Sequence, residues 1–148
     1  MKPIIDFFAA LLAAHGGLKV EGVAGGVAVP VKTSAVDLVT ATVTIDAGEA
    51  LSSAANLSAL GTPVAIITDD AWDTQSMTFQ GSADGETYAD LRSTGTEVTI
   101  AGVVAESMEP LDPLQFLACR YLKVRSGTAA SAANQVDATT VTVVCRPM

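Results

Sequence analysis

The sequence contains a single histidine and two cysteines among 148 residues. A structural zinc site takes four Cys or His ligands and a catalytic zinc site usually takes several histidines, so neither kind is expected. His15 is the one candidate catalytic base, and no Ser or Cys nucleophile lies near it in the sequence. The sequence therefore predicts no enzymatic activity and no metal or other cofactor.

Basic residues are also scarce, with 8 Lys and Arg against 16 Asp and Glu and a formal net charge of −8. Nucleic-acid binding needs basic residues that displace phosphate counterions, and a membrane-binding face needs a basic cluster. No apolar run reaches the roughly 20 residues of a transmembrane helix. Asp6 interrupts the apolar stretch that a secretory signal peptide would need. Nucleic-acid binding and membrane insertion are therefore not expected.

Charge and composition divide the chain into two parts. Residues 1–40 contain three basic and three acidic residues, no tryptophan and no tyrosine, and are mostly Ala, Val, Gly and Leu. Residues 41–148 contain five basic and thirteen acidic residues, which account for the whole net charge. We therefore predict an N-terminal arm over residues 1–40 and an acidic domain over residues 41–148.

The first part of the arm, residues 3–15, has apolar residues at helical spacing and ends at a Gly-Gly pair. A helix this short is only marginally stable by itself in water, so its apolar face is expected to dock against another chain or against the acidic domain. The expected contact residues are Ile4, Phe7, Phe8, Leu11 and Leu12.

The second part of the arm, residues 18–36, alternates valine with small residues, and Val27, Val29 and Val31 share one face of an extended segment. Glycines and Pro30 weaken a central strand. Two interpretations stay open: a flexible linker, or an extended arm that pairs with an exposed strand of a neighbour.

From residue 40 onward the sequence shows short alternating runs separated by turn signals. The expected strands are residues 40–46, 50–57, 63–68, 77–80, 88–92, 97–100, 117–125 and 139–145. An Asp-Gly pair at residues 84 and 85 is typical of a hairpin turn. About eight short strands with turns between them predict a β-sandwich or a β-barrel.

Acidic residues gather in two places within this domain. One group lies beside Trp72 and the other around the predicted hairpin; together they are Asp69, Asp70, Asp73, Asp84, Glu86 and Asp90. Paired carboxylates can hydrolyse glycosides or hold calcium when they are suitably spaced. Neither group has the spacing of a calcium loop, so solvated loop residues are the preferred interpretation and no metal ligands are assigned.

The two cysteines are candidates for a cross-strand pair. If the strands around residues 121 and 143 pair antiparallel, Cys119 and Cys145 lie directly opposite each other. The alternative is two buried, reduced thiols. Both interpretations stay open.

Two blocks of the domain resemble a known family. Residues 79–91 (FQGSADGETYADL) resemble the hairpin of discoidin-like, or galactose-binding-like, jelly rolls, and residues 114–125 (LQFLACRYLKVR) resemble one of their strands. Together with residues 126–128 and 134–135 they are similar to small virion structural proteins of tailed bacteriophages and phage-like particles. The resemblance spans about residues 62–146.

The resemblance implies a jelly-roll β-sandwich of antiparallel strands and a non-enzymatic virion structural protein: a capsid decoration, a head fibre or spike, or a tail component. Its implied partners are further copies of itself and capsid, spike or fibre subunits, in a virion assembled in the host cytoplasm. No ligand site carries over. The matching residues are architectural: Asp84 and Gly85 form a turn, Tyr121 packs, and Arg120 pairs with a carboxylate.

A second function stays open, that of a carbohydrate- or host-surface-binding module. Trp72 and Tyr88 are the candidate ligand contacts, because either aromatic ring can stack on a sugar of a host glycan. An exposed Trp72 would favour binding, and a buried one would make it part of the core.

Overall fold

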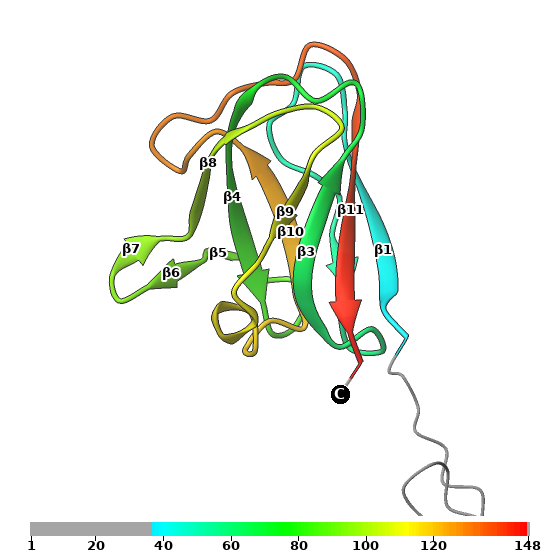
Figure 1. Cartoon of the computed structure of the whole chain (residues 1–148). Coiled ribbons are helices and arrows are strands. Elements are labelled where there is room, and N and C mark those ends of the chain that lie inside the picture. The colour runs from blue at the N-terminus through cyan, green and yellow to red at the C-terminus, as the bar shows by residue number, and fades with distance from the viewer. Residues whose placement is uncertain (1–36, 148) are drawn as a thin grey trace, which may run out of the picture. The chain divides into compact units, whose positions relative to one another are not determined.

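The computed structural model describes residues 37–147 (Figure 1). The chain divides into two units, residues 1–35 and 36–148, and only the second falls within the described part. The predicted helix over residues 3–15 and the arm residues Ile4, Phe7, Phe8, Leu11, Leu12, Val27, Val29 and Val31 lie outside it.

The described unit is mainly β, as the alternating pattern predicted. Its strands are antiparallel, and its one helical element is a short 3-10 turn, Pro113–Gln115. Across the described range, no helix has the length and apolar character needed to span a membrane. The described unit has eleven strands where eight were expected. The predicted runs at residues 50–57 and 88–92 form strands of only two residues, the predicted run at 77–80 is part of a longer strand, Gln75–Ser82, and the strand Met108–Pro110 was not predicted.

The first sheet has the strand order β1-β11-β3-β9. Its strands are β1 (Val39–Ile45), β11 (Thr139–Arg146), β3 (Thr62–Thr68) and β9 (Met108–Pro110). Val43 lies opposite Val141, and Val143 lies opposite Ile66. All four side chains are buried, because alternate residues of each strand point to the same face.

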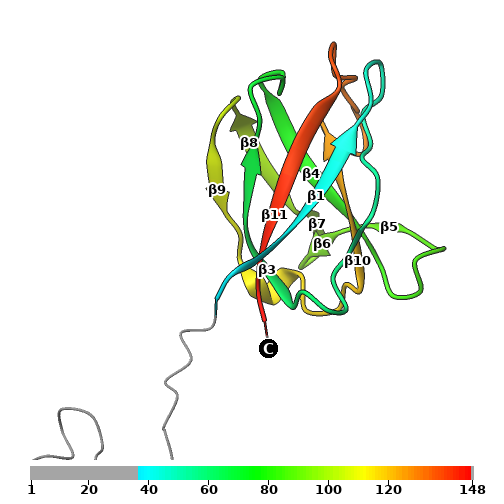
Figure 2. The same cartoon turned by 90° about the vertical axis from the view of Figure 1, so that its right-hand side faces the viewer.

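The second sheet has the order β2-β10-β4-β5, and β8 also pairs with β4. Its strands are β2 (Ala55–Asn56), β10 (Tyr121–Ser126), β4 (Gln75–Ser82), β5 (Ala89–Asp90) and β8 (Thr99–Val103). A small hairpin of β6 (Arg92–Ser93) and β7 (Thr96–Glu97) extends from it. In Figure 1 β8, β4 and β10 lie on one side and β3, β11 and β1 on the other, and in Figure 2 β1 and β11 lie in front of β4 and β10.

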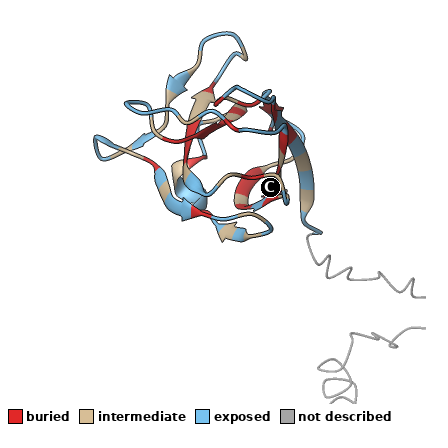
Figure 3. Ribbon diagram, turned by 90° about the horizontal axis from the view of Figure 1, so that it is seen from above, coloured by how far each residue is buried: buried red, intermediate tan, exposed pale blue. Residues whose placement is uncertain are grey.

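One hydrophobic core joins the two sheets. Buried residues line the space between them in Figure 3, and the core cluster draws on strands of both sheets. Phe79 of β4 packs edge-on against Phe116, with ring centroids 5.2 Å apart. Both rings are about 1 % exposed or less, so each contributes its full apolar area to the core.

The proposed cross-strand pairing of Cys119 with Cys145 is wrong. It required β10 to pair with β11, whereas β10 pairs with β2 and β4 in one sheet and β11 pairs with β1 and β3 in the other. Both cysteines are free thiols, Cys145 buried and Cys119 half-buried, and burial raises the pKa of each. Alternation within a strand does not say which strand lies beside it, and the register calculation had assumed the wrong neighbour.

Candidate functional site

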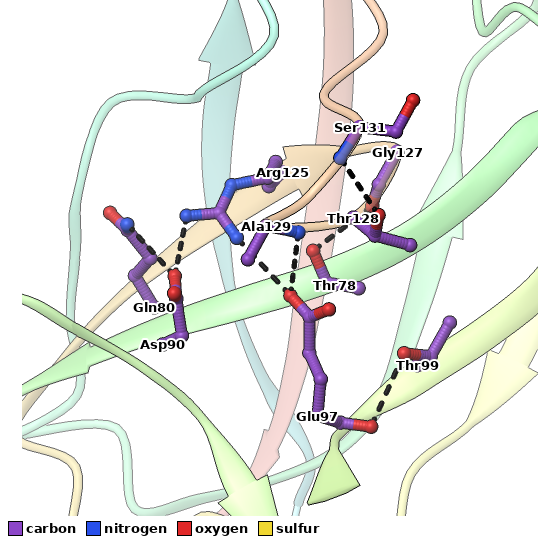
Figure 4. Close-up of polar contacts among 10 residues, drawn as sticks. All are labelled: Thr78, Gln80, Asp90, Glu97, Thr99, Arg125, Gly127, Thr128, Ala129 and Ser131. Carbon is purple, nitrogen blue, oxygen red and sulfur yellow. Dashed lines mark hydrogen bonds and ion pairs between the residues drawn. The ribbon is translucent and has the colours of Figure 1, made fainter.

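Two ion pairs of the described unit share Arg125, which lies near the end of β10 (Figure 4). Its Nη2 donates to Oδ1 of Asp90 at 2.5 Å, and its Nη1 donates to Oε1 of Glu97 at 3.2 Å. Oδ1 of Asp90 also accepts from Nε2 of Gln80 at 3.2 Å, and Oε1 of Glu97 accepts from the amide of Ala129 at 2.9 Å. The cluster thus links β10 and β4 with β5, β7 and the loop after β10.

In this cluster the charge of Arg125 is compensated by the carboxylates of Asp90 and Glu97. The hydrogen bond from Arg125, and next that from Gln80, lowers the pKa of Asp90 below its usual value. Arg125 is 8 % exposed, so its guanidinium needs these acceptors to offset the loss of water. The network therefore holds the β6–β7 hairpin against the second sheet.

The resemblance placed the structural arginine at the wrong position. Arg120, which was expected to pair with a carboxylate, is exposed, and the buried arginine is Arg125. Alternation places Arg120 and Arg125 on opposite faces of the predicted strand, but it does not show which of the two meets carboxylates. The carboxylates that pair with Arg125 belong to residues 90 and 97. These residues are distant in the sequence and come close to Arg125 only when the sheet has folded.

The hairpin turn after β4 is held by Asp84. Its Oδ1 accepts from the amides of Thr87 at 2.8 Å and Glu86 at 2.9 Å, and it also bonds with Oγ of Ser82 at 2.9 Å. These bonds, the one from Thr87 first, lower the pKa of Asp84 to about 2. Gly85 has a φ of 84°, and a Cβ there would lie 3.1 Å from the ring of Tyr121. The expected turn is present, and Asp84 and Gly85 stabilise its backbone conformation.

The other acidic group ties two loops together. Oδ1 of Asp69 accepts from Oγ1 of Thr139 and its Oδ2 accepts from the amide of Thr140, each at 2.6 Å. Oδ2 of Asp73 accepts from the amide of Val136 at 2.7 Å, and the amide of Asp73 donates to the buried Gln135 at 2.8 Å. In residues 37–147 no three His, Cys, Asp or Glu residues are grouped to hold a metal ion.

Trp72 is a core residue, so its assignment as a ligand contact is corrected. It is 3 % exposed, and its Nε1 donates to the carbonyl of Val103 at 3.2 Å. Tyr88 is half-buried, with Nζ of Lys123 4.3 Å from its ring centroid. The two rings flank opposite ends of β4, which spans roughly 25 Å at the usual rise per residue. They therefore cannot contact one small ligand together.

Exposed apolar side chains gather where the N-terminal residues enter the unit. A shallow groove of about 220 Å³ is lined by Thr62, Val64, Pro113, Leu117, Arg146 and Pro147. Leu117, which lines the groove, is 60 % exposed, and the nearby Leu114 is 75 % exposed. Val39 pairs with Cys145, one residue from the groove wall, and Leu38 is 50 % exposed. This end offers an apolar contact surface, which sequence alternation did not reveal because the exposed Leu114 and Leu117 lie outside the strands.

No family model and no curated protein matches the chain.

Proposed function

We propose that this protein is a non-enzymatic structural component of a tailed-phage or phage-like virion, such as a capsid decoration or a head fibre or spike, and that it assembles through its N-terminal arm. The observation that carries the proposal is the use of polar groups within the fold. Asp69, Asp73, Asp84, Asp90 and Arg125 all bond to the unit itself, whereas exposed leucines gather where the arm joins it. Such a unit offers contact surface, and these five charged side chains stabilise its own fold.

We further propose that the unit is a discoidin-like jelly roll. The two sequence blocks that carry the resemblance form neighbouring strands: Val124 of β10 lies opposite Phe79 of β4, and Tyr121 lies opposite Ser82. If the resemblance reflects a shared fold, the two sequence blocks that carry it are expected to lie in contact. The adjacency of β4 and β10 supports this interpretation.

Deletion of residues 1–36 tests the proposed function. We expect the remaining unit to fold, by far-UV circular dichroism, and to lose incorporation into particles co-expressed with it. A sharper variant keeps the full length and places charges on the apolar positions, Phe7→Asp with Phe8→Asp. Its matched control places the same charges on the opposite side of the predicted helix, Ala10→Asp with Ala13→Asp. Normal incorporation of the truncated chain would refute assembly through the arm.

The carbohydrate-binding alternative has less support, because the burial of Trp72 leaves Tyr88 as its sole aromatic candidate. A glycan array separates the two functions. Binding that is lost in Tyr88→Ala would favour the alternative, and an array without hits would favour the structural role.

A further inference from the structure

The two edge strands of the first sheet differ in how they are protected against pairing. β9 has three residues and contains Glu109 and Pro110, whereas β1 has seven residues and contains neither charge nor proline. Short length, charge and proline are the usual features that prevent another strand from adding to an edge. β1 is therefore the long, unprotected edge of this sheet, and Figure 1 shows it as the outermost strand.

The hydrogen bonds of Thr44 show which backbone groups of β1 face away from β11. Thr44 accepts from the amide of Ser53 at 2.8 Å and donates to Oγ of Ser53 at 3.1 Å, so its backbone groups point away from β11. Peptide groups alternate along a strand, and Leu38, Thr40 and Thr42 therefore present N–H and C=O to the same side. Ser53 covers the end of this edge at Thr44, and the open part runs from residue 38 to residue 42.

The side chains of this open edge favour a second copy of the same chain. Leu38, Thr40 and Thr42 are exposed and uncharged, in a protein with a net charge of −8. Across a two-fold axis each surface meets itself, so any charge on it would face the same charge. An uncharged edge on an acidic protein, with the β-branched Thr40 and Thr42, is suited to self-pairing.

We propose that β1 pairs antiparallel with β1 of a second copy, with Thr40 opposite Thr40 and Leu38 opposite Thr42. In this register all three residues exchange backbone hydrogen bonds with the partner, and the two four-stranded sheets join into one continuous sheet. The covered end at Thr44 stays outside the paired segment, together with Asp46. The valine segment at residues 27–31 is a less suitable occupant, because Pro30 has no N–H to donate.

The test uses the full chain and measures self-association by sedimentation velocity over a concentration series. Thr40→Lys and Thr40→Glu each place like charges opposite each other, and we expect each to weaken association about tenfold. An equimolar mixture of the two variants places opposite charges there and should restore it. Thr142→Lys is the matched control, since Thr142 lies beside Thr42 but one strand in from the edge. This control should associate like the unmodified protein.

Each outcome decides the proposal. Weakening by both single variants with recovery in the mixture supports it. A monomer at all concentrations, single variants that associate normally, or a mixture that stays dissociated would overturn it; the last result would point instead to another segment, such as residues 27–31. Hydrogen exchange adds a direct readout, because the amides of Thr40 and Thr42 should become protected as concentration rises. None of these results bears on particle incorporation, so the proposed function is tested separately.

Discussion

Arg125 donates to Asp90 and Glu97 at once, and so joins β10 to two short strands, β5 and β7. β5 and β7 have two residues each. Strands this short are marginal alone, and the guanidinium supplies a fixed point for both. Arg125 therefore adds a side-chain link between the β6–β7 hairpin and the second sheet, beside the backbone bonds of Leu91 and Val98 that flank the hairpin.

Replacement of Arg125 by Ala should destabilise the unit by about 2–4 kcal/mol, because it leaves two partly buried carboxylates without their partner. This range is reduced from that of a fully buried pair, since the side chain of Asp90 is 31 % exposed. Urea unfolding measures the loss. Arg120→Ala is the control, and removal of this exposed arginine should change stability by no more than about 0.5 kcal/mol. Equal effects of the two substitutions would contradict the structural role of Arg125.

Asp84 should make the unit sensitive to acid. Its pKa falls from 3.8 to about 2 on folding, so the folded state favours the charged form. The resulting stabilisation is complete above the unfolded value and is lost as pH falls from about 4 through about 2. Asp90 contributes in the same direction, because its pKa is also lowered. Urea unfolding at several pH values should therefore show stability decreasing over this window.

Asp84→Asn should make the acid limb of that pH profile shallower, because the variant has no carboxylate to protonate at this turn. Asp137→Asn, at an exposed loop position, is the matched control and should leave the limb unchanged. A profile of the Asp84 variant that superposes on that of the unmodified protein would show that this turn does not contribute.

Trp72→Phe should cost about 1–3 kcal/mol, because the carbonyl of Val103 loses its buried donor and the smaller ring leaves space in the core. Trp72 is the sole tryptophan, so its fluorescence reports this site directly. We expect blue-shifted emission and weak acrylamide quenching in the native protein. Red-shifted, readily quenched emission would mean that the ring lies in solvent.

Both cysteines should titrate as free thiols in denaturant without reductant, because Cys145 lies in β11 of the first sheet and Cys119 lies just before β10 of the second. In the native protein Cys119 should react with Ellman's reagent faster than Cys145, which is 0 % exposed. Burial raises both pKa values, so both should react more slowly than a free cysteine at neutral pH. Cys119→Ser should remove the faster phase and leave the slower one.

Local features could be read from the sequence because they depend on neighbouring residues. Alternation in residues 139–145 follows from the two-residue period of a strand, and the turn at Asp84 and Gly85 follows from side-chain capping and a positive φ. The excess of acidic residues is likewise a property of composition.

The sequence by itself thus determined a mainly β unit, its principal strands and its hairpin turn. Tertiary structure alone decided that the strand after Cys119 and the strand that contains Cys145 belong to different sheets, that Trp72 is buried and that Arg125 meets Asp90 and Glu97. These are contacts between residues far apart in the chain. The two-residue alternation of a strand shows which side chains share a face. It does not show which strands are neighbours, because each strand has two edges and several other strands could pair with either of them. The order of the strands therefore decides which residues a side chain contacts.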